Sequence, residues 1–304
     1  MDRTVYTTVD QELCIGCGRC IAVCPSRTLS LVEGKAAVTG DRSLSCGHCQ
    51  AVCPTGAVRV TCLDPTAGRF ATFTSEEKWL PWGGSDPGEL ARLMRSRRSC
   101  RNYRPDPVPR PLLADLIRLG RAAPSGTNSQ RWTFTVLPDR AAVMGLARAV
   151  GEFFQDLNHK AEKAWLRTLL KLVGRPELAH YWRDYYQSAR EAQAEWEATG
   201  RERLFHGAPA AILVGSEPGG SLPAEDALLA TQNMLLGAHA LGLGTCLVGF
   251  VVAALKANPA LKKAAGVPAA ETVHAVVALG WPDEEYLWVA GRKPAVVRWV
   301  GAGK

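Results

Sequence analysis

The chain has 304 residues, of which 47% are hydrophobic and 21% are charged. These values are typical of a globular protein long enough for two domains, and they exclude a disordered or fibrous chain. The net charge of +7 does not by itself predict a nucleic-acid partner, because bound anionic groups would offset it. The start MDRTVYTTVDQEL lacks the basic-then-apolar pattern of a signal peptide, so we expect the protein to be located in the reducing cytoplasm.

One apolar run, residues 227–255, contains no Lys, Arg, Asp or Glu and is long enough to span a bilayer. Polar residues and glycines interrupt it, however. The pattern therefore predicts a buried helix of a two-subunit core, then a turn and a short strand, with no membrane span. The interruptions are Gln232, Asn233, His239, Gly242, Gly244 and Gly249.

The N-terminal block, residues 1–62, holds seven cysteines of the ten in metal-ligand spacing and contains an internal repeat. The pattern Cys17-Gly18-x-Cys20 followed by Ala-Val-Cys-Pro recurs 29 positions later, starting at Cys46. The first copy, Cys14-x-x-Cys17-x-x-Cys20-x-x-x-Cys24-Pro25, is the cysteine run of bacterial ferredoxins. A zinc ribbon would require neither the proline nor the repeat, so it is the weaker interpretation.

By the interleaving of that pattern, three thiolates of one run and the last thiolate of the other hold each [4Fe–4S] cluster. The first cluster is then held by Cys14, Cys17, Cys20 and Cys53. The second has Cys24, Cys46 and Cys49, but Ser43 stands where its fourth cysteine is expected. Ser43 can ligate as an alkoxide, Cys62 can replace it, one corner iron can be lost, or the second cluster is absent. We favour two clusters.

The N-terminal block is too small to be stable on its apolar core alone, so the metal would contribute to its folding. Residues 4–8 and 57–62 alternate as short strands, and residues 28–32 and 36–39 are expected to form a hairpin around Gly34. Residues 63–88, rich in Pro and Gly, are expected to be a linker. Trp79, Leu80 and Trp82 are too apolar for a free linker, so we expect them to dock on the larger domain or to pack on one another.

The larger domain is expected to occupy residues 89–304. Ser85 or Asp86 can cap a helix at 89–97, a second helix follows at 112–121, and residues 124–130 form a loop. Residues 133–137 alternate as a strand, and Asp139 can cap a helix at 141–150.

Residues 92–131 contain ten arginines against Asp106 and Asp115, which predicts a bound anion. An Arg-rich solvated helix is the alternative for the run alone. Together with the motifs around it, the segment resembles the FMN-dependent nitroreductase family. The matching motifs are RRS-x-R (Arg97, Arg98, Ser99, Arg101), P-S-x-x-N-x-Q-x-W (Pro124, Ser125, Gly126, Asn128, Gln130, Trp132) and the C-terminal Arg292 with Lys293.

The resemblance implies a dimeric α+β sandwich, an antiparallel or mixed sheet flanked by helices, with one FMN per subunit at the interface. In that family the region equivalent to 151–206 is a helical cover that shapes the substrate pocket. Phe153, Phe154, Tyr185 and Tyr186 are therefore either pocket residues or packed core. The C-terminal segment would cross to the partner subunit.

The last hundred residues are expected to complete this domain. We predict strands at 208–215, 272–279 and 296–300, and a long helix capped by Asp226 and ending near Leu241. Thr245 and Gly249, in GLGTCLVGF, would bring backbone N–H groups close to the flavin ring. His239, Cys100 and Cys246 are interpreted as packed core residues.

Taken together, the motifs predict an FMN-dependent oxidoreductase in which iron–sulfur clusters pass electrons to FMN. The acceptor would be a small electron-poor molecule such as a nitroaromatic, quinone or enone, and the donor a ferredoxin or NAD(P)H. A flavin delivers its hydride from N5, so the hydride would come from FMN. No acid/base pair is evident in the sequence, and we name no catalytic side chain. Two alternatives stay open: an electron-transfer module between a ferredoxin and a partner enzyme, and a redox sensor. No nucleic-acid or membrane partner is expected.

Overall fold

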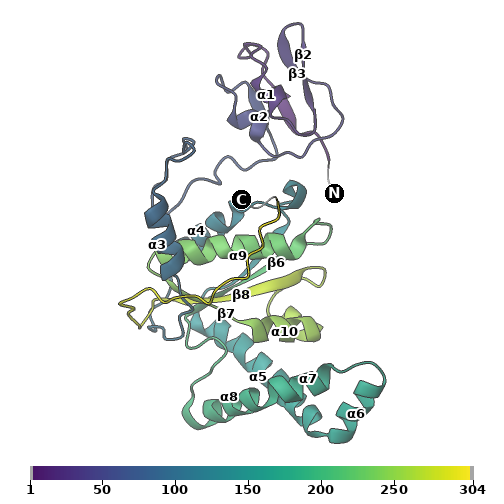
Figure 1. Ribbon diagram of the computed structural model, residues 1–304, viewed down its shortest axis with the longest axis vertical. Coiled ribbons are helices and arrows are strands. Elements are labelled where there is room, and N and C mark those ends of the chain that lie inside the picture. The colour runs from purple at the N-terminus through teal and green to yellow at the C-terminus, as the bar shows by residue number, and fades with distance from the viewer. Residues whose placement is uncertain (1–2, 302–304) are drawn as a thin grey trace.

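The structure is a computed structural model that describes residues 3–301. Three parts follow one another along its long axis (Figure 1): a small N-terminal domain, a central sheet with helices on both faces, and a helical arm at the far end. Among the described residues there is no helix both long enough and apolar enough to cross a membrane.

The small domain has the two strand pairs that the alternation predicts. β1 (Thr7–Val9) pairs antiparallel with β4 (Val58–Val60), and β2 (Leu29–Val32) pairs with β3 (Lys35–Val38) across a turn at Gly34. The sequence repeat is visible as two equivalent short helices, α1 (Arg19–Ala22) and α2 (His48–Ala51). Each helix follows a glycine in the left-handed region, Gly18 at φ 73° and Gly47 at φ 76°, a conformation that favours glycine.

The linker after this domain does not dock through its tryptophans. Trp79 is 70% exposed and Trp82 is 91% exposed. Their rings lie 5.8 Å apart, edge to face, so they pack on one another, which is the second of the two expectations. The Gly84 N–H donates to the Pro81 carbonyl and closes a turn that includes Trp82. The next element, α3 (Pro87–Ser96), begins at the predicted cap, with Asp86 accepting from the Gly88 and Glu89 amides.

The central sheet has the strand order β5-β6-β8-β7, and its neighbouring strands are all antiparallel. β6 (Ala210–Ser216) is buried at every residue, and its side chains alternate between the two faces. Ala211 and Leu213 belong to one core cluster, and Ile212 and Val214 belong to the other. The remaining strands are β5 (Trp132–Leu137), β7 (Gly244–Leu247) and β8 (Thr272–Gly280).

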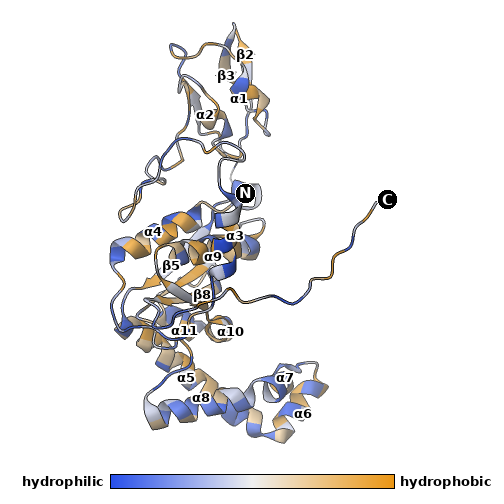
Figure 2. Cartoon of the chain, turned by 60° about the vertical axis from the view of Figure 1, so that its left-hand side comes forward, coloured by the Kyte–Doolittle hydropathy of each residue, from blue (hydrophilic) through white to orange (hydrophobic). Residues whose placement is uncertain are grey.

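Helices cover both faces of the sheet (Figures 1 and 2). One face packs against α4 (Arg110–Arg121) and α9 (Pro223–Ala240), and the other against α5 (Arg140–Glu162), α10 (Gly249–Ala257) and α11 (Pro259–Ala264). α5 begins at the predicted cap Asp139 but continues well beyond residue 150 into the arm. The arm is completed by α6 (Ala164–Leu172), α7 (Glu177–Asp184) and α8 (Tyr186–Thr199).

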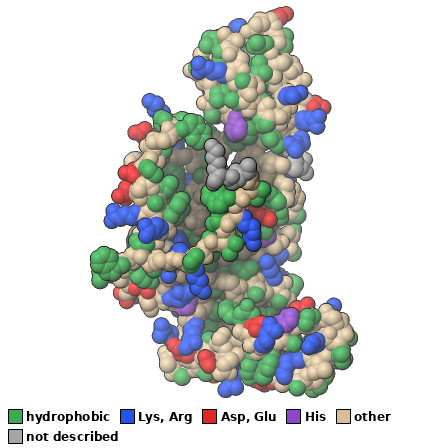
Figure 3. Space-filling view, in the orientation of Figure 1, with side chains coloured by type: hydrophobic (Ala, Val, Ile, Leu, Met, Phe, Trp, Pro, Cys, Tyr) green, Lys and Arg blue, Asp and Glu red, His purple; other side chains and the backbone are tan. Residues whose placement is uncertain are grey.

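Two predicted elements are wrong. Asp226 does not cap α9, because Pro223 already lies in its first turn and Leu222 is the capping residue. Residues 296–300 form no strand; they are exposed coil with no neighbouring strand inside the described chain. The C-terminal segment runs away from the body (Figure 2). Hydrophobic side chains cover a projecting tip on the left of Figure 3, and the exposed apolar residues of this segment include Leu287 and Trp288.

Candidate functional site

The cysteines of the small domain fall into two groups. Burial raises the pKa of the Cys20 thiol, and the nearby Cys14 and Cys17 raise it further. Burial likewise raises the pKa of Cys49, with Cys24 and Cys46 as the charged neighbours. Cys14 and Cys17 thus lie near Cys20, and Cys24 and Cys46 lie near Cys49, while the assignment of these groups to two clusters stays a prediction. Cys53 packs against the core that contains both Cys20 and Cys49, so this contact does not assign it to either group.

We call the first group site I (Cys14, Cys17, Cys20 and Cys53) and the second site II (Cys24, Cys46, Cys49 and Ser43). No three His, Cys, Asp or Glu side chains among residues 3–301 converge as they would on a single metal ion. A four-iron cluster is a larger body that needs its ligands at separate corners.

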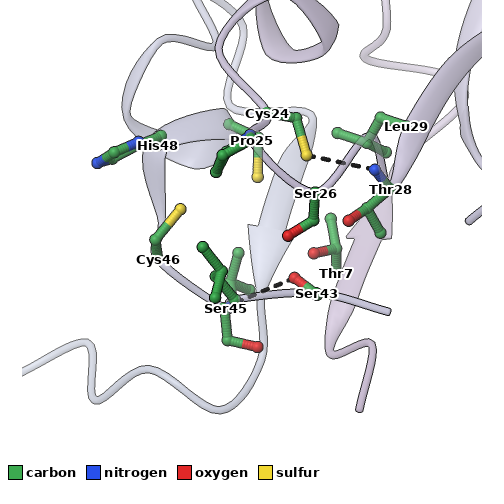
Figure 4. Close-up of a pocket in the computed structure, with 13 residues that line it drawn as sticks. Thr7, Cys24, Pro25, Ser26, Thr28, Leu29, Ser43, Ser45, Cys46 and His48 are labelled. Atoms are coloured by element: carbon green, nitrogen blue, oxygen red, sulfur yellow. Dashed lines mark hydrogen bonds between the residues drawn. The ribbon is translucent and has the colours of Figure 1, made fainter. Parts of the chain in front are cut away.

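Ser43 lines the same pocket as Cys24, Cys46 and Cys49. Figure 4 labels Ser43, Cys24 and Cys46 in this pocket. Ser43 is 7% exposed, and its Oγ accepts the Ser45 N–H at 3.0 Å. The Thr28 N–H donates to Cys24 Sγ at 3.3 Å, an amide-to-sulfur contact of the kind that tunes cluster potentials. Cys62 is exposed and does not line this pocket. Of the two candidate fourth ligands, Ser43 lines this pocket, and its role as a ligand stays a prediction.

The second region is a group of arginines beside β7, the arginine cluster: Arg97, Arg98, Arg101 and Arg292. The segment after α3 lies along β7, with Ser99 bridged to Thr245 and the Cys100 N–H donating to the Thr245 carbonyl at 2.9 Å. Gly244 permits this approach, because a Cβ there would lie 2.7 Å from the Cys100 side chain. The segment therefore carries the arginines to the edge of the sheet.

The arginine cluster has the electrostatics of an anion site. Burial lowers the pKa of Arg97, and the charges of Arg292 and Arg98 lower it further, so these guanidinium groups crowd together. Within residues 3–301, no guanidinium of the cluster forms an ion pair with a carboxylate, although the Glu284 carboxylate lies at the backbone N–H of Arg101. Crowded cations without ion-pair partners fit a phosphate group. Lys293, next to Arg292, is exposed.

His239 joins this region, which the sequence did not predict. It is exposed in the last turn of α9 rather than packed in the core. Partial loss of hydration where the ring lies against the protein lowers its pKa, and the charge of Arg97 lowers it further. No sequence motif marks it, because its position follows from the packing of α9 beside the segment after α3.

The third region is the loop Pro124–Gln130, which Asp226 organises. The Gly126 N–H donates to Asp226 Oδ1 at 2.8 Å, and Ser129 Oγ donates to Oδ2 at 3.0 Å. Within the loop, the Gln130 N–H donates to Ser125 Oγ, and Gln130 Nε2 donates to Asn128 Oδ1. Asp226 is thus a loop-ordering residue that the sequence had suggested only as a helix cap.

The structure does not bring the loop and the arginine cluster together in one chain. Asp226 lies in the first turn of α9 and His239 in the last, so the helix separates the two regions by about 20 Å at 1.5 Å per residue. Thr245 lies at the arginine end, beside Ser99. Gly249, the other predicted ring contact, is the exposed first residue of α10.

Asn128 points from the loop to the small domain. Its Nδ2 donates to the backbone carbonyls of Leu44 at 3.0 Å and of Ser45 at 3.1 Å. Both residues line site II and directly precede Cys46. A predicted flavin-loop residue therefore touches the second cysteine loop.

Of the four aromatic candidates for the substrate pocket, three are linked in one ring group with Tyr181 and Phe250. Phe154 packs at 6.2 Å from Tyr181 and 5.5 Å from Phe250, and Tyr185 lies 5.7 Å from Phe250. Tyr186 is buried with its hydroxyl donating to Glu162, so it is a core residue. Phe153 packs at 5.2 Å from Phe154 and against the core.

Comparisons with known proteins agree with these regions. A model of the 4Fe-4S dicluster domain matches residues 13–57. The chain is 30% identical over 190 residues to an NADH dehydrogenase of Thermus thermophilus, covering 62% of this chain and 84% of that protein. It is 27% identical over 212 residues to a 4-nitrobenzoate reductase of a Nocardioides species, covering 64% of this chain and 81% of that protein.

Among solved structures, an FMN-bound nitroreductase from Bacteroides fragilis shares the fold, with a TM-score of 0.52 at 22% identity over 70% of this chain and 99% of that one. A model described as the nitroreductase family matches residues 94–281, more than half of the chain, although Arg292 lies beyond the matched segment. The chain therefore belongs to the nitroreductase family, with a 4Fe-4S dicluster domain preceding the family domain.

Proposed function

We propose that the protein is an FMN-dependent oxidoreductase whose iron–sulfur domain supplies electrons for the reduction of a small electron-poor acceptor. The observation that carries the proposal is the arginine cluster, whose crowded guanidinium groups form no ion pair in the described chain. An FMN phosphate is an anion that fits this cluster, and the Bacteroides fragilis relative is a nitroreductase with bound FMN.

The FMN site that we propose has contributions from two chains of a homodimer. Arg97, Arg98, Ser99, Arg101, Arg292 and Lys293 hold the phosphate, and the backbone at Thr245 and Gly249 faces the ring. The partner chain supplies its own Pro124–Gln130 loop, because the loop of the same chain lies at the other end of α9. Bound there, FMN supplies two-electron chemistry and hydride transfer.

The iron–sulfur sites that we propose are site I, with four cysteines, and site II, completed by Ser43. Thiolates are the ligands that such clusters use, and the serine oxygen is a harder donor. Clusters of this kind supply electrons one at a time. The cysteines of both sites form no disulfides, which suits the reducing cytoplasm, where we propose that the protein is located.

The acceptor that we propose is aromatic, of nitroaromatic or quinone type, and enones remain in the same electron-poor class. The support is the ring group of Phe153, Phe154, Tyr181, Tyr185 and Phe250, together with the relative named for 4-nitrobenzoate. The donor is a reduced ferredoxin or NAD(P)H, the second suggested by the relative named NADH dehydrogenase.

The test is to purify the protein without oxygen, record its visible spectrum and iron content, and follow FMN bleaching with reduced ferredoxin, NADH or NADPH. Turnover of a nitroaromatic or quinone is expected. Cys14→Ala should retain FMN yet slow its reduction by ferredoxin, whereas Cys62→Ala, an exposed cysteine outside both sites, should match the parent. Equal rates in all three proteins, or electron exchange with a protein partner alone, would contradict the proposal.

A further inference from the structure

The small domain is attached to the loop end of its own chain at a defined point. Asn128 donates to the carbonyls of Leu44 and Ser45, which lie immediately before Cys46 of site II. Backbones in the left-handed region meet there, with Ser45 at φ 50° and Asn128 at φ 57°. Such positions are held only where the surrounding contacts fix them. Site II is thus the cysteine site that faces the flavin loop.

The linker strengthens this attachment instead of releasing the domain. Asp115 of α4 is fully buried and accepts the Ala71 and Thr72 amides, and Arg121 at the end of α4 lies 3.3 Å from Asp64. α4 leads directly into the Pro124–Gln130 loop. All three attachments therefore fix the small domain to the same end of the larger domain. In Figure 1, α2 lies nearer than α1 to the body of the larger domain.

The arginine cluster lies at the opposite end of α9, about 20 Å away along the helix. On the FMN site proposed above, the flavin held by a chain's arginines lies against the loop of its partner. We propose that the iron–sulfur domain of each chain delivers electrons to the FMN whose phosphate the partner chain holds. This inference rests on the proposed function and adds which subunit serves which flavin.

The reaction balances with the donor named above. Reduction of one FMN takes up two electrons and one proton. Two molecules of reduced ferredoxin are oxidised, each giving one electron through the cysteine sites, and water supplies the proton.

Two mixed dimers test the assignment. They carry the same three substitutions, which are divided between the two chains in one dimer and joined in a single chain in the other. In the split dimer, one chain carries Cys46→Ala and the other carries Arg97→Ala with Arg292→Ala. In the joint dimer, one chain carries all three substitutions and the other is unchanged. Differently tagged chains are co-expressed and purified in two steps without oxygen, and the bleaching of FMN by reduced ferredoxin is followed by rapid mixing.

Both mixed dimers should retain half the FMN of the unchanged dimer. This FMN content is the folding control: it shows that the flavin-binding domains are folded even if the Cys46→Ala substitution unfolds the small domain that carries it. In the split dimer, the remaining FMN lies on the loop of the chain with intact cysteines, so the fast phase of bleaching is kept. In the joint dimer, the remaining FMN lies on the loop of the damaged chain, so the fast phase is lost.

The opposite pattern would show delivery within one chain and would overturn the assignment, as would equal rates in the two dimers. The proposed function has a separate test in the same series. If the unchanged dimer binds no FMN, or if a homodimer of Cys46→Ala chains bleaches as fast as the parent, the proposed function itself fails and the assignment falls with it.

Discussion

Thr72 donates twice to one oxygen of Asp115, from its backbone N–H and from its hydroxyl, each at 2.7 Å. Asp115 Oδ1 in turn accepts from Arg118 at 2.9 Å. A carboxylate buried in α4 is therefore satisfied by the linker and by one arginine of its own helix. The linker is not a free tether, because its polar backbone completes the hydrogen bonding of a buried charge.

Replacing Thr72 with Val should loosen this attachment. The hydroxyl bond is lost while the backbone bonds remain. Because Thr72 is exposed, water weakens this bond, and the free energy of local opening should fall by only about 1 kcal/mol. Native-state hydrogen exchange at the Ala71 and Thr72 amides measures it. Thr74→Val is the matched control, because Thr74 is exposed and makes no hydrogen bond to Asp115 in the described chain. Equal exchange in both variants would show that the Thr72 hydroxyl does not hold the linker to Asp115.

The contact between the linker and Asp115 should also depend on pH. Burial acts to raise the pKa of Asp115, but hydrogen bonds from Ala71, Thr72 and Arg118 outweigh it, so the pKa is lowered. A carboxylate with a lowered folded pKa stabilises the fold above its unfolded value, about 3.9, and that contribution is lost as the pH falls through the folded value. The protection factor of the Thr72 amide, the exchange rate of an unstructured peptide at the same pH divided by that of the amide, should therefore fall below about pH 4. Asp115→Asn should remove this pH dependence. Acid also damages the cysteine sites, but it does so equally in the parent and in the variant, so their difference reports Asp115 alone.

Arg292→Ala should weaken FMN retention. The lost group is one of the crowded cations beside Arg97, and a charge-assisted phosphate contact is worth about 1.5–3 kcal/mol. Titration of flavin-free protein, followed by quenching of flavin fluorescence, measures the change. Arg298→Ala removes the same charge from the same exposed segment and should leave the affinity unchanged. If the two variants bind FMN equally well, Arg292 does not contact the phosphate.

Ser43→Ala should remove one corner of site II. The anaerobic parent should contain about eight iron per chain, and the variant about one fewer, with the paramagnetic signal of a three-iron cluster. Ser45→Ala is the matched control, because only the backbone N–H of Ser45 bonds to Ser43. Iron analysis and electron paramagnetic resonance report the outcome. An unchanged iron content in Ser43→Ala would mean that another group, or none, fills that corner.

The fold was predictable where the information is local. The Cys14 to Pro25 run and its repeat at Cys46 fix ligand spacing within short segments, and the two short helices follow left-handed Gly18 and Gly47. Asp86 and Asp139 cap the helices that follow them because an N-cap contact spans only a few residues. The alternation of β6 likewise places its side chains on two faces whatever covers them.

Local reasoning failed where the partner of a side chain lies far along the chain. Asp226 resembles a cap in the sequence, yet its carboxylate binds Gly126, one hundred positions earlier. Trp79 and Trp82 suggest docking by hydrophobicity, yet the linker is held at Ala71 and Thr72 by a buried aspartate of α4. Such contacts depend on how whole helices pack, which residue type and spacing do not encode.

The sequence by itself determined the chemistry available: thiolates in cluster spacing, Ser43 in place of a cysteine, and an excess of arginine before and after a polar loop. Only the tertiary structure decided where these parts stand relative to one another. It set the loop and the arginines at opposite ends of α9, and it turned Asn128 toward Ser45. The reason is geometric. A rigid helix fixes the distance between its ends, and a short motif does not encode the end of the helix at which it will pack.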